Sequence, residues 1–133
     1  KTKTQQDLES RKNEVQYNYK VFAINMDRTV LYDRINRRVD VMLENGLINE
    51  VKGLIDSGIT KDNQCMQGIG YKEVYDAIIS NDYSNLSELL KLNSRHYAKR
   101  QITFFKKLDR LNYLTGDIDS LVLQTLKLIE ECK

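Results

Sequence analysis

The sequence predicts a mainly α-helical fold with one or two short strands. Through most of the 133 residues, apolar side chains recur at the spacing of amphipathic helices. The alternation typical of strands is confined to two short segments, 20–26 and 111–116. The chain has no proline to interrupt a helix, and its hydrophobic content of 41% suits one compact domain.

The first predicted helix directly follows the first strand. The segment KVFAINM (20–26) has the pattern of a buried strand, and Asp27 after it has the side chain of a helix N-cap. We expect the helix over 29–45, with Gly46 as its C-cap. Its apolar positions recur at helical spacing and are Leu31, Ile35, Val39, Met42 and Leu43.

Three more helices are predicted in the middle of the chain. The first spans 47–57 before Gly58, and the second spans about 71–80 after a glycine turn. The third is the longest: Asn85 or Ser87 caps it and it runs to about residue 108. Its apolar stripe consists of Leu86, Leu90, Tyr97, Phe104 and Leu108.

The sequence predicts less regular structure at the start of the chain than at its end. Residues 1–19 are polar and lack an initiator Met, so we expect a truncated chain whose start is a solvated helix or a disordered arm. Near the other end, LNYLTG (111–116) is expected to form a short strand and a turn. Asp117 or Asp119 then caps a last amphipathic helix.

Composition excludes several classes of protein. Lys plus Arg exceed Asp plus Glu by only 21 to 19, so attraction to nucleic acid requires local clustering. The two cysteines, Cys65 and Cys132, lie far apart, which disfavours a zinc site or a disulfide framework and fits a reduced cytosol. No apolar run approaches the roughly 20 residues of a membrane span, so we expect a soluble protein.

The longest predicted helix carries an unusual cluster of charge. Residues 89–108 contain no Asp or Glu, and Arg95, Lys99 and Lys106 share one face opposite the apolar stripe. Solvated helices gain from acidic partners three or four residues away, so this basic edge suggests RNA phosphates as an external partner. A merely solvated face is the alternative. The basic residues are Lys91, Arg95, Lys99, Arg100, Lys106 and Lys107.

The helix over 29–45 contains a second anomaly. Arg38 falls inside the apolar arc, and Arg34 stands one turn before it on the same edge. Arg37 projects instead among acidic neighbours, as an ordinary surface residue does. A buried guanidinium is costly unless paired, and its forked donors match phosphate or carboxylate. A phosphate-type ligand site and a structural pair with a carboxylate are equally open.

Other candidate residues carry weaker signals. Gly68-Ile-Gly70 before a helix is compatible with a phosphate loop, although turn chemistry is the commoner use of such glycines. His96 has no Cys or second His nearby to complete a metal site, and we interpret it as an ordinary polar residue on one flank of the longest predicted helix. Tyr71, Tyr75 and Tyr97 can stack on bases or serve as core tyrosines. The residues alone therefore indicate an anion-binding helical module.

Three segments together resemble the tRNA dimethylallyltransferase (isopentenyltransferase) family. They are LYDRINRRVDVMLENGLINEV (31–51), MQGIGYKEV (66–74) and NSRHYAKRQITFF (93–105), and their order and spacing also fit. The resemblance covers about residues 18–110. It implies transfer of a dimethylallyl group from dimethylallyl diphosphate to the N6 amine of the adenine 3′ of the tRNA anticodon, with Mg²⁺ assisting.

The resemblance also implies where the segment belongs. It places residues 1–18 at the exit of an inserted helical anticodon-binding domain, and 19–133 in the C-terminal part of an α/β P-loop-like catalytic core. The phosphate loop, nucleotide- and ATP-binding features and magnesium ligands would lie in a missing N-terminal half. This piece alone is therefore expected to be inactive. The expected whole is a cytoplasmic monomer without a membrane partner.

The family's functional positions are carried over by motif. Arg34 and Arg38 match the arginine-bearing helix that neutralises the leaving diphosphate, and the sequence leaves open which of them touches it. Binding to the tRNA anticodon stem-loop is assigned to Arg95, Lys99, Arg100, Lys72 and Tyr71. Two alternatives remain: a non-enzymatic helical RNA-binding module, and a protein-interaction domain with structural arginines.

Overall fold

The computed structural model describes residue 5, residues 19–108 and residues 111–131. Contacts divide the chain into two compact units. The sheet unit combines Lys1–Asn25 with Asp109–Lys133, and the helical unit is Met26–Leu108. Apart from Gln5 and Tyr19, the expectations for residues 1–19 and for the exit of an inserted domain concern residues outside the described part.

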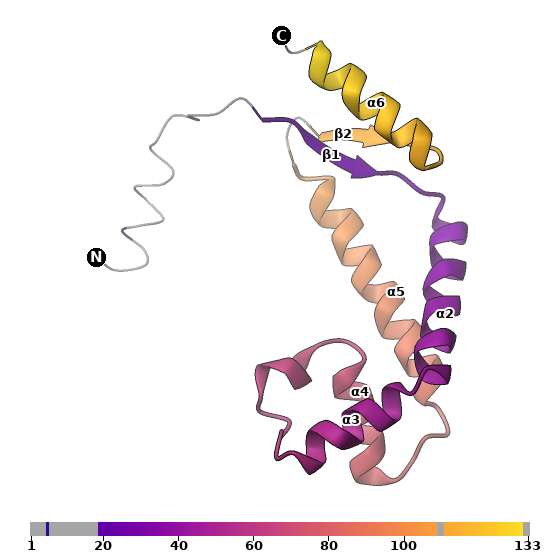
Figure 1. Cartoon of the computed structure of the whole chain (residues 1–133), viewed down its shortest axis with the longest axis vertical. Helices are drawn as coiled ribbons and strands as arrows, with labels where there is room; N and C mark the ends of the chain where they lie inside the picture. Colours follow the sequence, from indigo (N-terminus) through magenta and orange to yellow (C-terminus); the bar gives the residue numbers. More distant parts are fainter. Residues whose placement is uncertain (1–4, 6–18, 109–110, 132–133) are drawn as a thin grey trace. The chain divides into compact units, whose positions relative to one another are not determined.

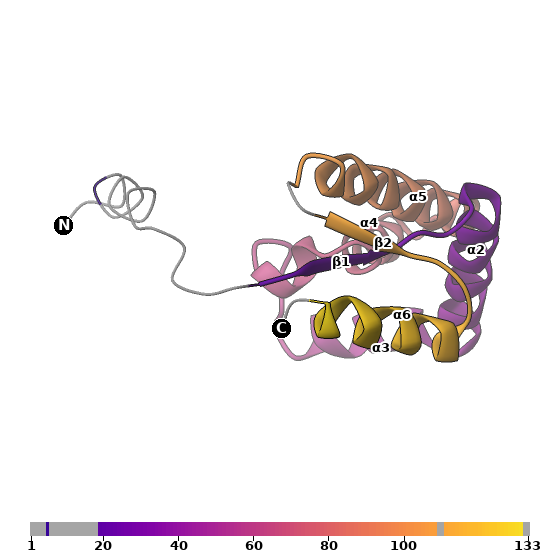
Figure 2. The ribbon, with the colours of Figure 1, turned by 90° about the horizontal axis from the view of Figure 1, so that it is seen from above.

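Over residues 19–25 and 111–131, the sheet unit consists of a parallel strand pair and one helix (Figures 1 and 2). β1 (Val21–Ile24) pairs with β2 (Leu111–Leu114), with Val21 opposite Leu111 and Ile24 opposite Leu114. α6 (Ile118–Glu130) packs against β2. Parallel strands need a long crossover connection, and here the entire helical unit lies between them in sequence. Both short strands expected from the sequence are confirmed.

Burial within the sheet unit differs from expectation. The first strand was expected to be buried, but Ile24 is 63% exposed and the rest of β1 is only half-buried. The reason is that, among the described residues of the unit, β1 has a single partner strand. The last helix begins as expected: the Asp117 carboxylate accepts from the Ser120 amide at 2.9 Å, so Asp117 rather than Asp119 is the cap.

The helical unit contains four α-helices and one short 3₁₀ turn in its described residues. They are α2 (Arg28–Glu44), α3 (Leu47–Asp56), η1 (Gln64–Gln67), α4 (Tyr71–Ser80) and α5 (Leu86–Phe105). All four helices expected in this part of the chain are present. α5 packs along α2, and α4 packs against α3 and α5 (Figure 1).

Capping residues set the ends of α2. The Asp27 carboxylate accepts from the amides of Thr29 and Val30, at 2.9 and 3.3 Å, and these bonds lower the pKa of Asp27. Asn45 ends the helix, and Gly46 follows with φ +96°. This left-handed conformation suits glycine at the position after a helix, and it turns the chain directly into α3.

One apolar cluster holds the helical unit together. Met66, Val51 and Val74 are fully buried, and they join η1, α3 and α4. Met66 is therefore the anchor of the connection between α3 and α4. The buried members of the cluster are Val39, Leu47, Val51, Met66, Val74, Ala77, Leu86 and Leu90.

The apolar stripe expected on α5 is only partly correct. Leu86 and Leu90 are buried as expected, but Tyr97 is 47% exposed and Phe104 is 60% exposed. Ala98 is buried in place of Tyr97. A small side chain permits close approach of two helices. The expected stripe contained only large apolar residues, and alanine was therefore left out of it.

Replacing Met66 by Ala is expected to lower the free energy of unfolding by about 2–5 kcal/mol, because removal of this fully buried side chain leaves a cavity in the core. The neighbouring exposed residue provides a matched control, and Cys65→Ala is expected to change stability by no more than about 0.5 kcal/mol. Chemical denaturation measures both. Equal effects of the two substitutions would contradict the anchoring role of Met66.

Candidate functional site

The helical unit contains a cavity of about 840 Å³ between α2, residues 67–70 and α5. Its walls are mainly apolar, with a few polar groups among them, which is the usual character of a small-molecule site. The apolar side chains include Leu31, Ile35, Met42, Leu90 and Ala98. The polar residues are Arg38, Gln67, Ser94, Tyr97, Arg100 and Gln101.

Arg38 lines this cavity from α2. It follows Leu31 by seven residues and Ile35 by three, so helical geometry places all three on the same face. The guanidinium was expected to be buried in the apolar arc, but Arg38 is exposed and borders the open cavity. Within the described part of the chain, no carboxylate pairs with Arg38, which removes the reason for interpreting it as one half of a structural ion pair.

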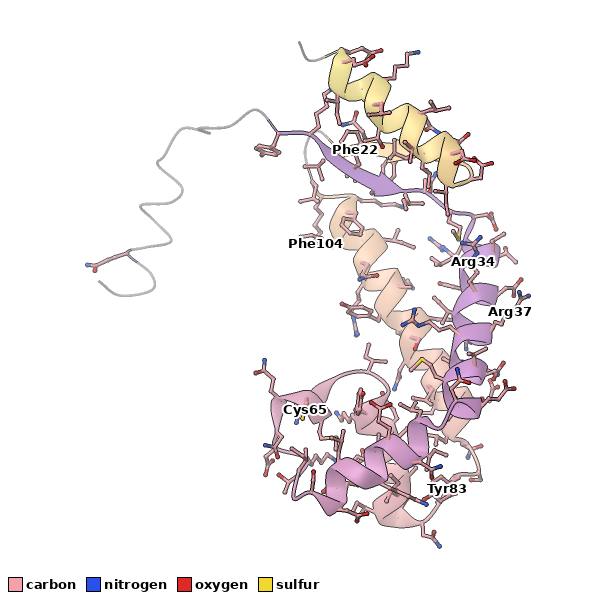
Figure 3. All side chains as sticks on the ribbon, viewed as in Figure 1. Phe22, Arg34, Arg37, Cys65, Tyr83 and Phe104 are labelled. Atoms are coloured by element: carbon pink, nitrogen blue, oxygen red, sulfur yellow. The ribbon has the colours of Figure 1, made fainter. Side chains whose placement is uncertain are left out.

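The structure distinguishes Arg38 from the other arginines of α2. Arg34 is exposed one turn earlier and is not among the residues that line the cavity. Arg37 projects from α2 on the side away from α5 (Figure 3). The expected pairing of Arg37 with surrounding acids is not observed for Asp40, which binds Lys91 of α5 instead. Arg38 is therefore the arginine of α2 that faces the cavity.

Arg100 connects the large cavity with a smaller polar pocket of about 250 Å³. Its guanidinium carbon lies 5.8 Å from the centroid of the Tyr97 ring, a cation–π distance. The smaller pocket is also lined by Lys72 and His96, which can carry positive charge, and by the carboxylate of Glu73. The sequence assigned Arg100 to RNA alone, but the structure places it at both cavities.

The glycine turn between the two cavities serves the start of α4. The Gly70 amide donates to the Glu73 carboxylate at 2.8 Å, and Asn93 of α5 donates to the same carboxylate at 2.7 Å. Gly70 has φ +102°, a conformation that favours glycine. Because its amide is already bonded, Gly70 is used for turn chemistry, and the phosphate-loop alternative is not supported for this amide.

Tyr71 joins α4 to α3. Its hydroxyl donates to the Glu50 carboxylate, and this hydrogen bond, with smaller contributions from burial and from the charge of Glu50, raises the pKa of Tyr71. This contact gives Tyr71 a structural role, while its assignment to tRNA stays a prediction. Tyr75 is half-buried against the core, and Tyr97 is the tyrosine that borders the cavity.

The basic edge of α5 is divided in the structure. Arg95 was expected to point outward, but it is partly buried and donates to the Asn36 side chain at 2.7 Å. Lys91 lies 2.8 Å from Asp40 and 3.5 Å from Glu88, so acidic partners exist on another helix and at the start of α5 itself. Lys99 is exposed, as expected for an outward residue.

Metal and membrane sites are not found in the described residues. No three His, Cys, Asp or Glu side chains there gather closely enough to hold a metal ion. The described residues therefore do not fit a magnesium site, and the expectation of Mg²⁺ held by ligands elsewhere stays a prediction. No helix in this part of the chain is both long and apolar enough to span a bilayer.

Comparison with known proteins identifies the family. Residues 1–108 match the family model described as IPP transferase. This chain is a member of the IPP transferase family. It is 42% identical over 123 residues to the tRNA dimethylallyltransferase of Acetivibrio thermocellus, covering 90% of this chain and 39% of that protein. It is 49% identical over 107 residues to the enzyme of the same name from Bacillus anthracis, covering 78% and 33%.

Solved structures of IPP transferases confirm the fold. The full-length tRNA isopentenylpyrophosphate transferase of Bacillus halodurans superposes with a TM-score of 0.81 at 42% identity, over 95% of this chain and 43% of that one. The Staphylococcus epidermidis transferase gives 0.80 at 36% identity, over 100% and 44%. The chain thus spans about two fifths of these relatives, and its fold is the C-terminal portion of an α/β core.

Several residues at the site were missed from the sequence. Asn36 and Asp40 give α5 its polar partners on α2, and Asn93 joins Glu73 to α5. Polar side chains on a helix give no signal of which distant residue they meet, so none of these three pairs was predictable. Asn36 and Asp40 are four residues apart and therefore share one face of α2. This spacing was the one available hint that the face meets polar side chains of another helix.

The raised pKa of Tyr71 predicts a loss of stability in alkali. The folded protein holds the phenol proton more tightly than the unfolded chain, so this contribution is complete below about pH 10 and is lost as the pH rises through the folded-state pKa. Tyr71→Phe is therefore expected to be less stable than the wild type at pH 8, with a smaller difference at pH 11. Urea denaturation at both values measures this, and a constant difference would contradict it.

Proposed function

We propose that this chain supplies the leaving-group side of the donor site in a tRNA dimethylallyltransferase. The proposed reaction moves a dimethylallyl group from dimethylallyl diphosphate to the N6 amine of the adenine 3′ of the anticodon. The observation that carries the proposal is the apolar cavity bordered by Arg38 and Arg100, which lack carboxylate partners among the described residues. The family membership supports it.

The chemistry of the donor matches the two kinds of surface in this cavity. Leu31, Ile35 and Met42 offer an apolar wall of the kind that a short hydrocarbon group prefers. As the bond between carbon and the diphosphate oxygen breaks and the bond to N6 forms, N6 gives up a proton to a base elsewhere in the longer protein. The diphosphate leaves with the electron pair of the broken bond, so negative charge gathers on it. A guanidinium placed there stabilises that charge through paired N–H donors, and we assign this role to Arg38.

The RNA side of the site is proposed to be the smaller polar pocket and the exposed part of α5. Lys72, Arg100 and Lys99 are exposed, and Lys72 and Arg100 border the same pocket. Positive groups of this kind bind the phosphate backbone and fix the register of the RNA without reading its bases. Tyr71 and Arg95 belong to this group by motif, although both already have partners within the chain.

We further propose that residues 1–133 do not catalyse transfer alone, that the working enzyme is a cytoplasmic monomer, and that Mg²⁺ and the nucleotide-binding features reside elsewhere in the longer protein. The chain spans only 33–39% of the curated relatives, and the described residues contain no metal cluster.

The assay is therefore made with the full-length gene product that contains this segment, an anticodon stem-loop, dimethylallyl diphosphate and magnesium. Absence of transfer, with RNA still bound, would favour a non-enzymatic RNA-binding module.

Arg38→Ala in that full-length protein is expected to lower kcat by about 10²-fold or more, as loss of one charge-stabilising donor often does. Its affinity for tRNA is expected to change much less. Arg37→Ala is the matched control, because Arg37 belongs to the same helix and projects away from α5. Steady-state kinetics with the stem-loop measures both. Unchanged turnover in Arg38→Ala would transfer the assignment to Arg34.

Lys99→Met and Lys72→Met are each expected to weaken stem-loop binding and to reduce the slope of log affinity against log salt by about 1, since each removes one phosphate contact. Lys61→Met provides a control, because Lys61 pairs with Asp76 at 2.6 Å and borders neither cavity. Filter binding over a range of salt concentrations measures the slope. Equal slopes for all three variants and the wild type would contradict the proposed RNA surface.

A further inference from the structure

A row of polar contacts runs along one side of the packing between α2 and α5. The Arg95 guanidinium donates to the Asn36 side chain at 2.7 Å, and the Lys91 ammonium lies 2.8 Å from the Asp40 carboxylate. The Ser87 hydroxyl lies 3.5 Å from the same carboxylate. We call these five residues the polar ladder.

The polar ladder fixes the register of the two helices. Its members step by four residues in opposite directions, from Asn36 to Asp40 on α2 and from Arg95 through Lys91 to Ser87 on α5. Four residues are about one helical turn, or about 5.4 Å of rise. Sliding α2 along α5 by a fraction of a turn would therefore lengthen all of these contacts at once. The apolar contacts between these helices have no comparable directionality.

The cavity lies on the other side of the same packing. Between the ladder and the cavity lie the buried side chains of Val39, Leu90 and Ala98. Arg38 follows Asn36 by two residues, so it projects about 200° around α2 from it at 3.6 residues per turn. A rotation of α2 that lengthened the bond to Asn36 would also turn Arg38 along the cavity wall.

The ladder residues are poor candidates for contacts with RNA. Arg95 is partly buried and already donates to Asn36, and the Lys91 side chain is only 16% exposed. An RNA phosphate would have to displace these bonds to reach either group. Lys99, one turn beyond Arg95, is exposed and has no side-chain partner among the described residues. It therefore offers a free charge on the same helix.

We propose that Arg95 is a positioning residue of the donor site: by bonding to Asn36 it fixes the rotation of α2 that directs Arg38 into the cavity. This inference rests on the proposed function for the identity of the ligand. It also reassigns Arg95, which the family motif grouped with the tRNA contacts. The guanidinium acts through Arg38 and does not touch the diphosphate itself.

The test uses the full-length gene product with four variants: Arg95→Met, Asn36→Ala, the two combined, and Asn36→Asp with Arg95→Lys. The first two are each expected to lower kcat by about 10–10²-fold, because a displacement of roughly 1 Å at a reacting group has effects of that size. The combined variant is expected to be no worse than either, since both remove one interaction. The Asp–Lys variant reproduces the chemistry of Lys91 and Asp40 and is expected to recover most of the turnover.

RNA binding separates a positioning role from a phosphate contact. Arg95→Met is expected to leave the salt slope of stem-loop affinity unchanged, whereas the control Lys99→Met lowers it by about 1. A slope lowered by about 1 in Arg95→Met, with Asn36→Ala behaving as wild type, would overturn the proposal and restore Arg95 as an RNA contact. Unchanged turnover in Arg95→Met, or no recovery in the Asp–Lys variant, would overturn it as well.

Binding of inorganic diphosphate distinguishes failure of this inference from failure of the proposed function. If the wild type transfers no dimethylallyl group, the prenyltransferase proposal fails, and calorimetric affinity for diphosphate then replaces kcat in the same four-variant comparison. Coupled losses in Arg95→Met and Asn36→Ala, with recovery in the Asp–Lys variant, would still support the positioning role. A wild type that binds no diphosphate would overturn it, since Arg38 would then have no anion to meet.

Discussion

The packing of α2 against α5 is the constraint on which the rest of the helical unit depends. The helices meet through buried Val39, Leu90 and Ala98, with polar contacts on one side and a cavity on the other. A large residue at position 98 would push the helices apart and lengthen the polar contacts together. The same packing therefore determines both the stability of this unit and the direction of Arg38.

Elements near this packing are connected to it by a small number of specific contacts. Glu73 accepts from the Gly70 amide and from Asn93, so the start of α4 is held to α5. Tyr71 in turn holds α4 to α3 through Glu50, and Met66, which belongs to the segment connecting these two helices, is buried in the core. These contacts place residues 67–70 at the cavity, where they form one of its walls. The site is thus built largely by groups that have no chemical role in it.

Much of the secondary structure was predictable because its signals are local. Asp27, Gly46 and Asp117 mark element ends through bonds within a few residues, and α4 has the bounds expected from its glycine turn. The arginines of α2 were also found from sequence, since a charge within an apolar arc is a local anomaly. The sequence did not distinguish Arg34 from Arg38. Only the structure shows that Arg38 lines the cavity and that Arg34 does not.

The errors arose where tertiary packing decides between neighbouring faces of one helix. The helical spacing of residues cannot tell that Ala98 rather than Tyr97 is buried, or that Arg95 donates a hydrogen bond to Asn36 on another helix. Likewise, the alternation in β1 indicated a strand correctly, but burial depends on partners that are not encoded in its own residues.

The most direct test of the central claim is a crystal structure of the full-length gene product with a non-hydrolysable analogue of dimethylallyl diphosphate. We expect the diphosphate within hydrogen-bonding distance of the Arg38 guanidinium and the hydrocarbon group against Leu31, Ile35 and Met42. A bound analogue whose diphosphate lies outside the cavity between α2 and α5, with Arg38 making no contact to it, would contradict the account.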